Sequence, residues 1–75
     1  MAVGPNEIDA LVSYIYANCD KKVEGISRDK EQLTLEIYGG LDDRQIERIM
    51  DNFIWIEGLE HSTTESVIFQ IEYEE

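Results

Sequence analysis

The sequence has only one cysteine, Cys19, and only one histidine, His61. One cysteine cannot form a disulfide within the chain, and one cysteine with one histidine cannot supply the four ligands of a structural zinc site. No apolar run approaches the roughly 20 residues that a membrane-spanning helix needs. Residues 1–5 have neither the basic nor the apolar region of a signal peptide. We therefore expect a cytoplasmic protein that folds without disulfides or metal.

Basic residues are also scarce, with six Lys and Arg against 17 Asp and Glu and a net charge of −11. Affinity for a nucleic-acid backbone depends on cations that neutralise phosphates, so direct nucleic-acid binding is not expected. Hydrophobic residues make up 43% of the chain and seven residues are aromatic, which is too apolar for a disordered protein. We expect a single domain, residues 1–75, with a thin core.

The first periodic segment predicts a helix from residue 7 to residue 18 or 19, with Asn6 as the N-cap and Glu7 in the first turn. Apolar residues recur every three or four positions and predict a core face: Ile8, Leu11, Val12, Ile15, Tyr16 and Cys19. The opposite face carries no charge and comprises Ala10, Ser13, Tyr14 and Ala17. Because small residues permit close packing, we expect this face to form a homodimer interface around Tyr14.

Residues 33–38 alternate between apolar and polar side chains and predict a half-buried strand. Residues 23–28 predict a weaker edge strand, in which Gly25 forms a bulge. Residues 29–31 are polar and short enough to be the hairpin loop between them.

The second helix has a clear start. Asp42 is the expected N-cap and Gln45 completes a capping box, while Leu41 and Ile46 occupy the positions of a hydrophobic staple. The buried stripe is expected to be Ile46, Ile49, Met50 and Phe53, and Gly58 is expected to end the helix. A polar connection, residues 60–65, then leads to a third strand at residues 67–73.

These segments predict an α+β fold of order αββαβ without internal repeats. The expected architecture is a two-layer domain with two helices on one face of a three-stranded sheet. A helix between the second and third strands favours a parallel arrangement of those strands. The order resembles a ferredoxin-like βαββαβ chain that lacks its first strand. The gap beside the second strand would then be filled by the third strand, the N-terminal residues or a partner; topology alone implies no function.

No pair of groups has the spacing of a catalytic acid, base or nucleophile, so we do not expect an enzyme. His61 could activate a hydroxyl of residues 62–64, but a solvated loop histidine is the favoured interpretation, and Cys19 is interpreted as a buried hydrophobe. No calcium-binding loop is present, and no cofactor is expected. The glycines at 39 and 40 favour a turn over a phosphate cradle, because Asp42 and Asp43 would repel phosphate.

An acidic row is predicted on the second helix, where Asp43, Glu47 and Asp51 follow one another at four-residue intervals. Such carboxylates stand ~6 Å apart along the axis, close to the spacing of phosphates in a nucleic-acid strand. The alternative is a solvated face with local ion pairs to Arg44 and Arg48. The second candidate surface is the outer face of the sheet with the C-terminal tail: Glu36, Glu72, Glu74 and Glu75, near Tyr38 and Ile68.

Two functions remain open. One is an inhibitor or adaptor that docks on a basic, nucleic-acid-handling surface of another protein, because a large net charge speeds encounter with a cationic partner. The alternative is a homodimeric accessory or scaffold subunit, in which the acidity serves only solubility.

Overall fold

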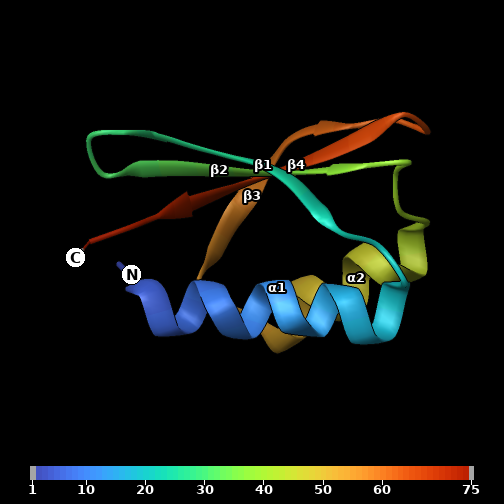
Figure 1. Ribbon diagram of the computed structural model, residues 1–75, viewed down its shortest axis with the longest axis horizontal. Helices are drawn as coiled ribbons and strands as arrows, with labels where there is room; N and C mark the ends of the chain where they lie inside the picture. Colours follow the sequence, from blue (N-terminus) through green and yellow to red (C-terminus); the bar gives the residue numbers. More distant parts are fainter. Residues whose placement is uncertain (1, 75) are drawn as a thin grey trace.

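The computed structural model describes residues 2–74. The elements in chain order are α1 (Pro5–Cys19), β1 (Val23–Asp29), β2 (Gln32–Tyr38), α2 (Asp43–Asn52), β3 (Ile56–Ser62) and β4 (Ser66–Glu72). The strands form one sheet of order β1-β2-β4-β3, in which all neighbours are antiparallel. Both helices lie on the same side of this sheet (Figure 1). The predicted α+β class is confirmed, but the sheet has four strands instead of three.

The start of α1 differs from the prediction. Gly4 is the N-cap and Pro5 is the first helical residue, where its missing N–H costs nothing. The Gly4 amide donates to Glu7 Oε2 at 3.1 Å. The prediction of Asn6 as N-cap is therefore wrong, because Pro5 and Glu7 fix the helix start two residues earlier.

The start of α2 is confirmed. The Gln45 amide donates to Asp42 Oδ1 at 2.8 Å, and the Asp42 amide donates to Gln45 Oε1 at 3.1 Å. The helix ends earlier than expected, at Asn52 with Phe53 as C-cap. Ile54 and Trp55 form a turn after Phe53, and Ile56 begins β3, so the helix does not extend to Gly58.

The presence of β3 changes the direction of the last strand relative to β2. β4 lies antiparallel to both β2 and β3, so β2 and β3 run in the same direction. The expected parallel crossover through α2 thus leads from β2 to β3. β4 then returns through a hairpin and inserts between these two strands. The prediction that the last strand is parallel to β2 is wrong, because an additional strand reverses the chain before it.

The termini of the domain meet at one side of the sheet (Figure 1). Val3 forms a parallel bridge with Tyr73, and the Glu74 amide donates to the Val3 carbonyl at 2.8 Å. Moving β4 from the end of the order αββαββ to its front gives βαββαβ, the ferredoxin-like order. The strand that the predicted order lacked is therefore present at the other end of the chain.

The element order αββαββ divides the domain into two αββ halves. The β2–β4 register is symmetric about the Leu35–Phe69 pair, since Leu33 pairs with Ile71 on one side and Ile37 with Val67 on the other. The sheet order β1-β2-β4-β3 places the corresponding strands of the two halves at corresponding positions on either side of the β2–β4 pair.

The two outer strands obey the same symmetry. β1 begins Val-Glu-Gly-Ile and β3 begins Ile-Glu-Gly-Leu. Each strand has a register shift before its glycine, Gly25 in β1 and Gly58 in β3. The bulge expected at Gly25 is confirmed. β3 has a second shift between Leu59 and His61, which has no counterpart in β1.

The core lies between the sheet and the helices. The side chains with less than 2% exposure come from α1, α2, β2 and β4: Phe69, Leu11, Ile15, Leu35, Ile37, Ile49, Ile71 and Val67. Two parts of the predicted core are corrected. Tyr16 is 60% exposed, because it lies at the open margin of α1, and only Ile49 of the α2 stripe is buried. The remaining α2 stripe residues are half-buried and pack against the core edge.

Gly40 is the residue at which the β2–α2 connection is most constrained. Its φ is +68°, and an added Cβ would lie 2.7 Å from the Thr63 carbonyl oxygen. Gly39 also has a positive φ, +88°, but an added Cβ there would meet only the Lys21 ammonium, at 2.9 Å. The flexible lysine can move away, whereas the backbone of the β3–β4 loop cannot do so without disturbing the hairpin.

We therefore expect Gly40→Ala to lower the free energy of unfolding by about 2–4 kcal/mol, through left-handed backbone strain and a backbone clash. Gly39→Ala is the matched control and should cost about 1–2 kcal/mol, because it introduces the strain alone. Urea denaturation measures both. Equal losses for the two variants would show that the close approach of the loop is unimportant.

Candidate interaction surfaces

Charge is distributed unequally between the two halves. Residues 21–30 contain four of the six basic residues, and no Lys or Arg follows Arg48. Residues 49–75 contain seven acidic residues. β1 and β3 are the opposite edges of the sheet. Four cations and four acids lie in or directly beside β1, within residues 20–31, whereas the β3 segment, residues 56–62, contains two acids and no Lys or Arg.

The acidic row of α2 is exposed along its length, at Asp43, Glu47 and Asp51. Glu47 and Asp51 line a shallow depression of about 240 Å³ together with Arg44 and Arg48. The row is therefore mixed in charge along its second half. Asp43 stands apart at the first turn of the helix.

β3 adds two exposed carboxylates that sequence analysis missed, Glu57 and Glu60. Both lie at register shifts of this edge strand. They were missed because residues 54–57 were assigned to the second helix and residues 60–65 to a connection. The repeated Glu-Gly step of residues 24–25 and 57–58 was the signal that could have identified β3.

Glu36 and Glu72 lie on the outer, helix-free face of the sheet, but far from each other. Glu36 is opposite Ile68 and Glu72 is opposite Gln32 in the β2–β4 register. Four residues of strand separate these positions, which is ~13 Å. They do not form one cluster. Tyr38 is 56% exposed, Glu74 is exposed, and Glu75 lies outside the described residues.

The uncharged face of α1 divides into two parts. Ala10, Ser13 and Ala17 are exposed. Tyr14 is half-buried and packs edge-to-face on Phe53, with ring centroids 5.3 Å apart. Its hydroxyl accepts a hydrogen bond from Asn52 Nδ2 at 3.4 Å. Tyr14 thus joins α1 to the end of α2 within one chain.

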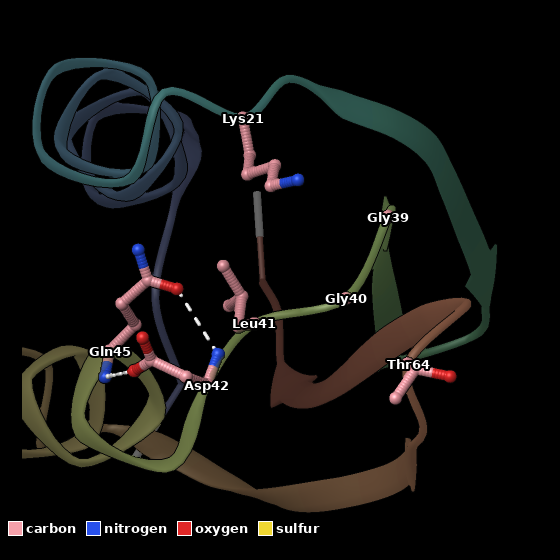
Figure 2. Close-up of a pocket in the computed structure, with 7 residues that line it drawn as sticks. All are labelled: Lys21, Gly39, Gly40, Leu41, Asp42, Gln45 and Thr64. Atoms are coloured by element: carbon pink, nitrogen blue, oxygen red, sulfur yellow. Dashed lines mark hydrogen bonds between the residues drawn. The ribbon is translucent and has the colours of Figure 1, made fainter.

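A depression of about 310 Å³ lies between the β2–α2 turn and the loop after β3. Figure 2 shows that the Lys21 side chain extends into it, while the Thr64 side chain points away. The Asp42 carboxylate at this helix start is held by the Gln45 amide. A carboxylate already occupies the favourable end of the helix dipole, which agrees with the interpretation of the glycines as a turn.

The surroundings of His61 and Cys19 do not favour a catalytic role for either side chain. His61 Nε2 lies 3.4 Å from Thr63 Oγ1, but that hydroxyl accepts from the amides of Glu65 and Ser66 at 3.1 and 3.2 Å. The hydroxyl therefore organises the β3–β4 loop. Burial and, to a smaller extent, the nearby charge of Asp42 raise the pKa of the Cys19 thiol above the ordinary value of a cysteine. A raised pKa lowers the thiolate fraction on which cysteine reactivity depends.

Within residues 2–74, no three His, Cys, Asp or Glu side chains are grouped closely enough to hold a metal ion. In the same range, neither helix has the length and hydropathy required to cross a membrane.

A comparison of the chain with models of known protein families finds no match. Comparisons with curated proteins and with solved structures also find none.

The contact between Tyr14 and Phe53 predicts that Tyr14 stabilises the monomer. Tyr14→Ala should lower the free energy of unfolding by about 1–3 kcal/mol, the amount for a half-buried aromatic pair. Tyr14→Phe should cost less than about 1 kcal/mol, because the ring contact is kept and the lost hydrogen bond is long. Chemical denaturation at two protein concentrations separates this effect from dimer formation. A loss that appears only at high concentration would place Tyr14 in a dimer interface instead.

Proposed function

We propose that the domain is an interaction module, an inhibitor or adaptor, that docks its acidic half on a basic surface of another protein. The observation that supports this most directly is the absence of Lys and Arg after Arg48, over a segment that includes the β3 edge. The exposed carboxylates of β3 and of the α2 row belong to the same αββ half.

The kind of partner follows from the charge. Acidic groups that no cation accompanies generate a field that attracts cationic surfaces and repels anionic ones. Basic surfaces of this kind are typical of proteins that handle nucleic acid, since they must neutralise phosphates. The regular spacing of carboxylates on α2 suits such a surface, and the proposed inhibitor would occupy it in place of the nucleic acid.

The depression that Arg44 and Arg48 share with the row refines the proposed contact. These arginines reduce the negative potential around Glu47 and Asp51. The carboxylates of β3, at Glu57 and Glu60, have no basic residue near them in the chain. We therefore include the β3 edge in the proposed interface, beside Asp43, Glu47 and Asp51, with Glu36 and Glu72 as a separate second surface.

A capture experiment from lysate of the source organism, with elution in a salt gradient, identifies the partner. The proposal expects a basic protein released at moderate salt. Retention of only neutral or acidic proteins would contradict it.

Once the partner is known, charge reversal tests the surface. The edge variant Glu57→Lys with Glu60→Lys, and the row variant Asp43→Lys, Glu47→Lys and Asp51→Lys, should each slow association about tenfold at low salt and flatten its salt dependence. The matched control is Asp9→Lys with Glu31→Lys, two exposed acids of the other half. It changes the net charge as much as the edge variant does, so an equal effect of both would exclude a localised acidic interface.

The alternative function, a homodimeric accessory or scaffold subunit, rests on the exposed and uncharged residues of α1, Ala10, Ser13 and Ala17. Because Tyr14 packs within the chain, a substitution there would disturb the fold as well as a dimer. Ala17→Arg is the cleaner variant for this purpose.

For this alternative, sedimentation equilibrium should show a dimer for the unmodified chain and a dissociation constant raised about tenfold or more by Ala17→Arg. The control is Asp9→Arg, an exposed change of α1 outside the uncharged face. Monomer at all concentrations in the unmodified chain would end the alternative.

A further inference from the structure

The outer side of β1 is an open edge of the sheet. Among the described residues no strand pairs with it, and residues 25–29 follow β2 in five consecutive register pairs. β3, at the other edge, is interrupted by two register shifts. Bulges protect an edge strand from pairing with another chain, because they twist its hydrogen-bonding groups out of line. Of the two edges, β1 has the longer regular stretch for an added strand.

Apolar side chains are exposed along the same edge. A groove of about 420 Å³ lies between α1 and β1, and Val12, Tyr16 and Val23 are part of its lining. Tyr16 is 60% exposed. Ile26, on the helix side of β1 opposite the core residue Leu35, is 53% exposed. Water therefore reaches the apolar margin between α1 and β1, and an added strand would cover part of this margin.

The segment around β1 is electrically balanced, although the chain is strongly acidic. Residues 20–31 contain four cations and four acids, so the net charge of −11 comes entirely from the rest of the sequence. Such a segment does not select a partner by net charge, because it presents an alternation of opposite charges. A partner with the same charges in the reverse direction can match this alternation.

Two copies of β1 match when they run antiparallel with Ser27 opposite itself. Residues 25–29 of one copy then face residues 29–25 of the other, so the whole regular stretch is paired. One position farther out, Glu24 lies opposite Lys30 of the second copy, and the reverse pair forms as well. Both side chains are exposed. Opposite charges at facing positions stabilise a strand pair, and between residues 24 and 30 no like charges face each other in this register.

The neighbouring registers of the same two strands are less favourable. An axis at Ile26 would place Lys22 opposite Lys30 of the second copy. An axis at Arg28 would place that arginine opposite itself. Because like charges directly opposite each other destabilise a strand pair, the charges around β1 favour Ser27 as the centre.

Repulsion between the acidic edges of two copies is weak in this arrangement. The two β3 strands become the outermost strands of the joined sheet, seven strand spacings or ~34 Å apart. At physiological ionic strength the Debye length is about 8 Å, so the repulsion between the carboxylates of the two β3 edges is largely screened. The charge of the chain thus leaves β1 as the edge at which two copies can approach.

We propose that two copies of this chain associate through β1, about a two-fold axis at Ser27 perpendicular to the sheet. The two sheets join through main-chain hydrogen bonds, and the exposed Ile26 is covered. The β1–β2 turn of each copy, residues 30–31, comes beside residues 23–24 at the groove of the other. The β3 edge stays free, so this dimer is independent of the proposed docking on a basic surface. It also differs from a dimer through the uncharged face of α1, because Ala10 and Ala17 do not line the groove.

Sedimentation equilibrium of the whole 75-residue chain at about 0.15 M salt should show a dimer, and the amide chemical shifts of residues 25–29 should change with protein concentration. Ser27→Lys places two cations opposite each other at the axis and should raise the dissociation constant about tenfold. The matched control, Ser62→Lys, changes an exposed serine of β3 and should leave the constant unchanged. Monomer at millimolar concentration would overturn the proposal and leave the edge to a partner of another kind, and equal weakening by both variants would also overturn it.

Exchange of the facing charges tests the register. Glu24→Lys and Lys30→Glu should each raise the dissociation constant about threefold to tenfold, because like charges then face each other twice in the dimer. The double variant restores opposite charges at unchanged net charge and should dimerise about as tightly as the unmodified chain. If Ser27→Lys fails to fold, this exchange decides, since both of its positions are exposed. A double variant as weak as the single ones, or a dimer that only Ala17→Arg disrupts, would overturn the proposal.

Discussion

The fold depends on one antiparallel pairing, that of β2 with β4. These central strands contribute the fully buried Leu35 and Phe69, which face each other at the middle of the register. Each half supplies a helix, an outer strand and one of these inner strands, so the pairing is what joins the halves into one core. Each half alone has one helix and a two-stranded hairpin. Because a two-stranded hairpin is only marginally stable in water, we do not expect either half to fold without the other.

Sequence signals identified correctly those elements that depend on residues close together in the chain. The Asp42–Gln45 capping box needs only two residues three positions apart, and it forms as predicted. β2 and β4 alternate cleanly in their burial and were both identified. β3 was missed because its two register shifts interrupt the alternation by which strands are recognised. With β3 missing, the direction of β4 was necessarily predicted wrongly.

The candidate surfaces also differ in how far they could be predicted: surfaces set by local spacing were predicted, and those set by contacts between distant residues were not. A helix has a fixed period, so Asp43, Glu47 and Asp51 were placed on one face correctly, and all three are exposed. The position of Tyr14 depends on Phe53, which is distant in the chain and which pattern analysis of a single helix cannot place. β1 was predicted as an edge strand, and the sheet order confirms this. The contrast between its mixed charge and the acidic opposite edge was beyond the sequence, because β3 itself was missed.

The closure of the chain by Val3 and Tyr73 affects how the domain assembles during synthesis. β4 is the last of the six elements to leave the ribosome, yet it occupies a central position. Until it emerges, β2 has an open side, α1 lacks much of the surface on which it packs, and Val3 has no partner strand. Residues at the start of the domain must therefore wait for those near its end. Folding of this domain is expected to be a single late event, dominated by contacts between distant parts of the chain.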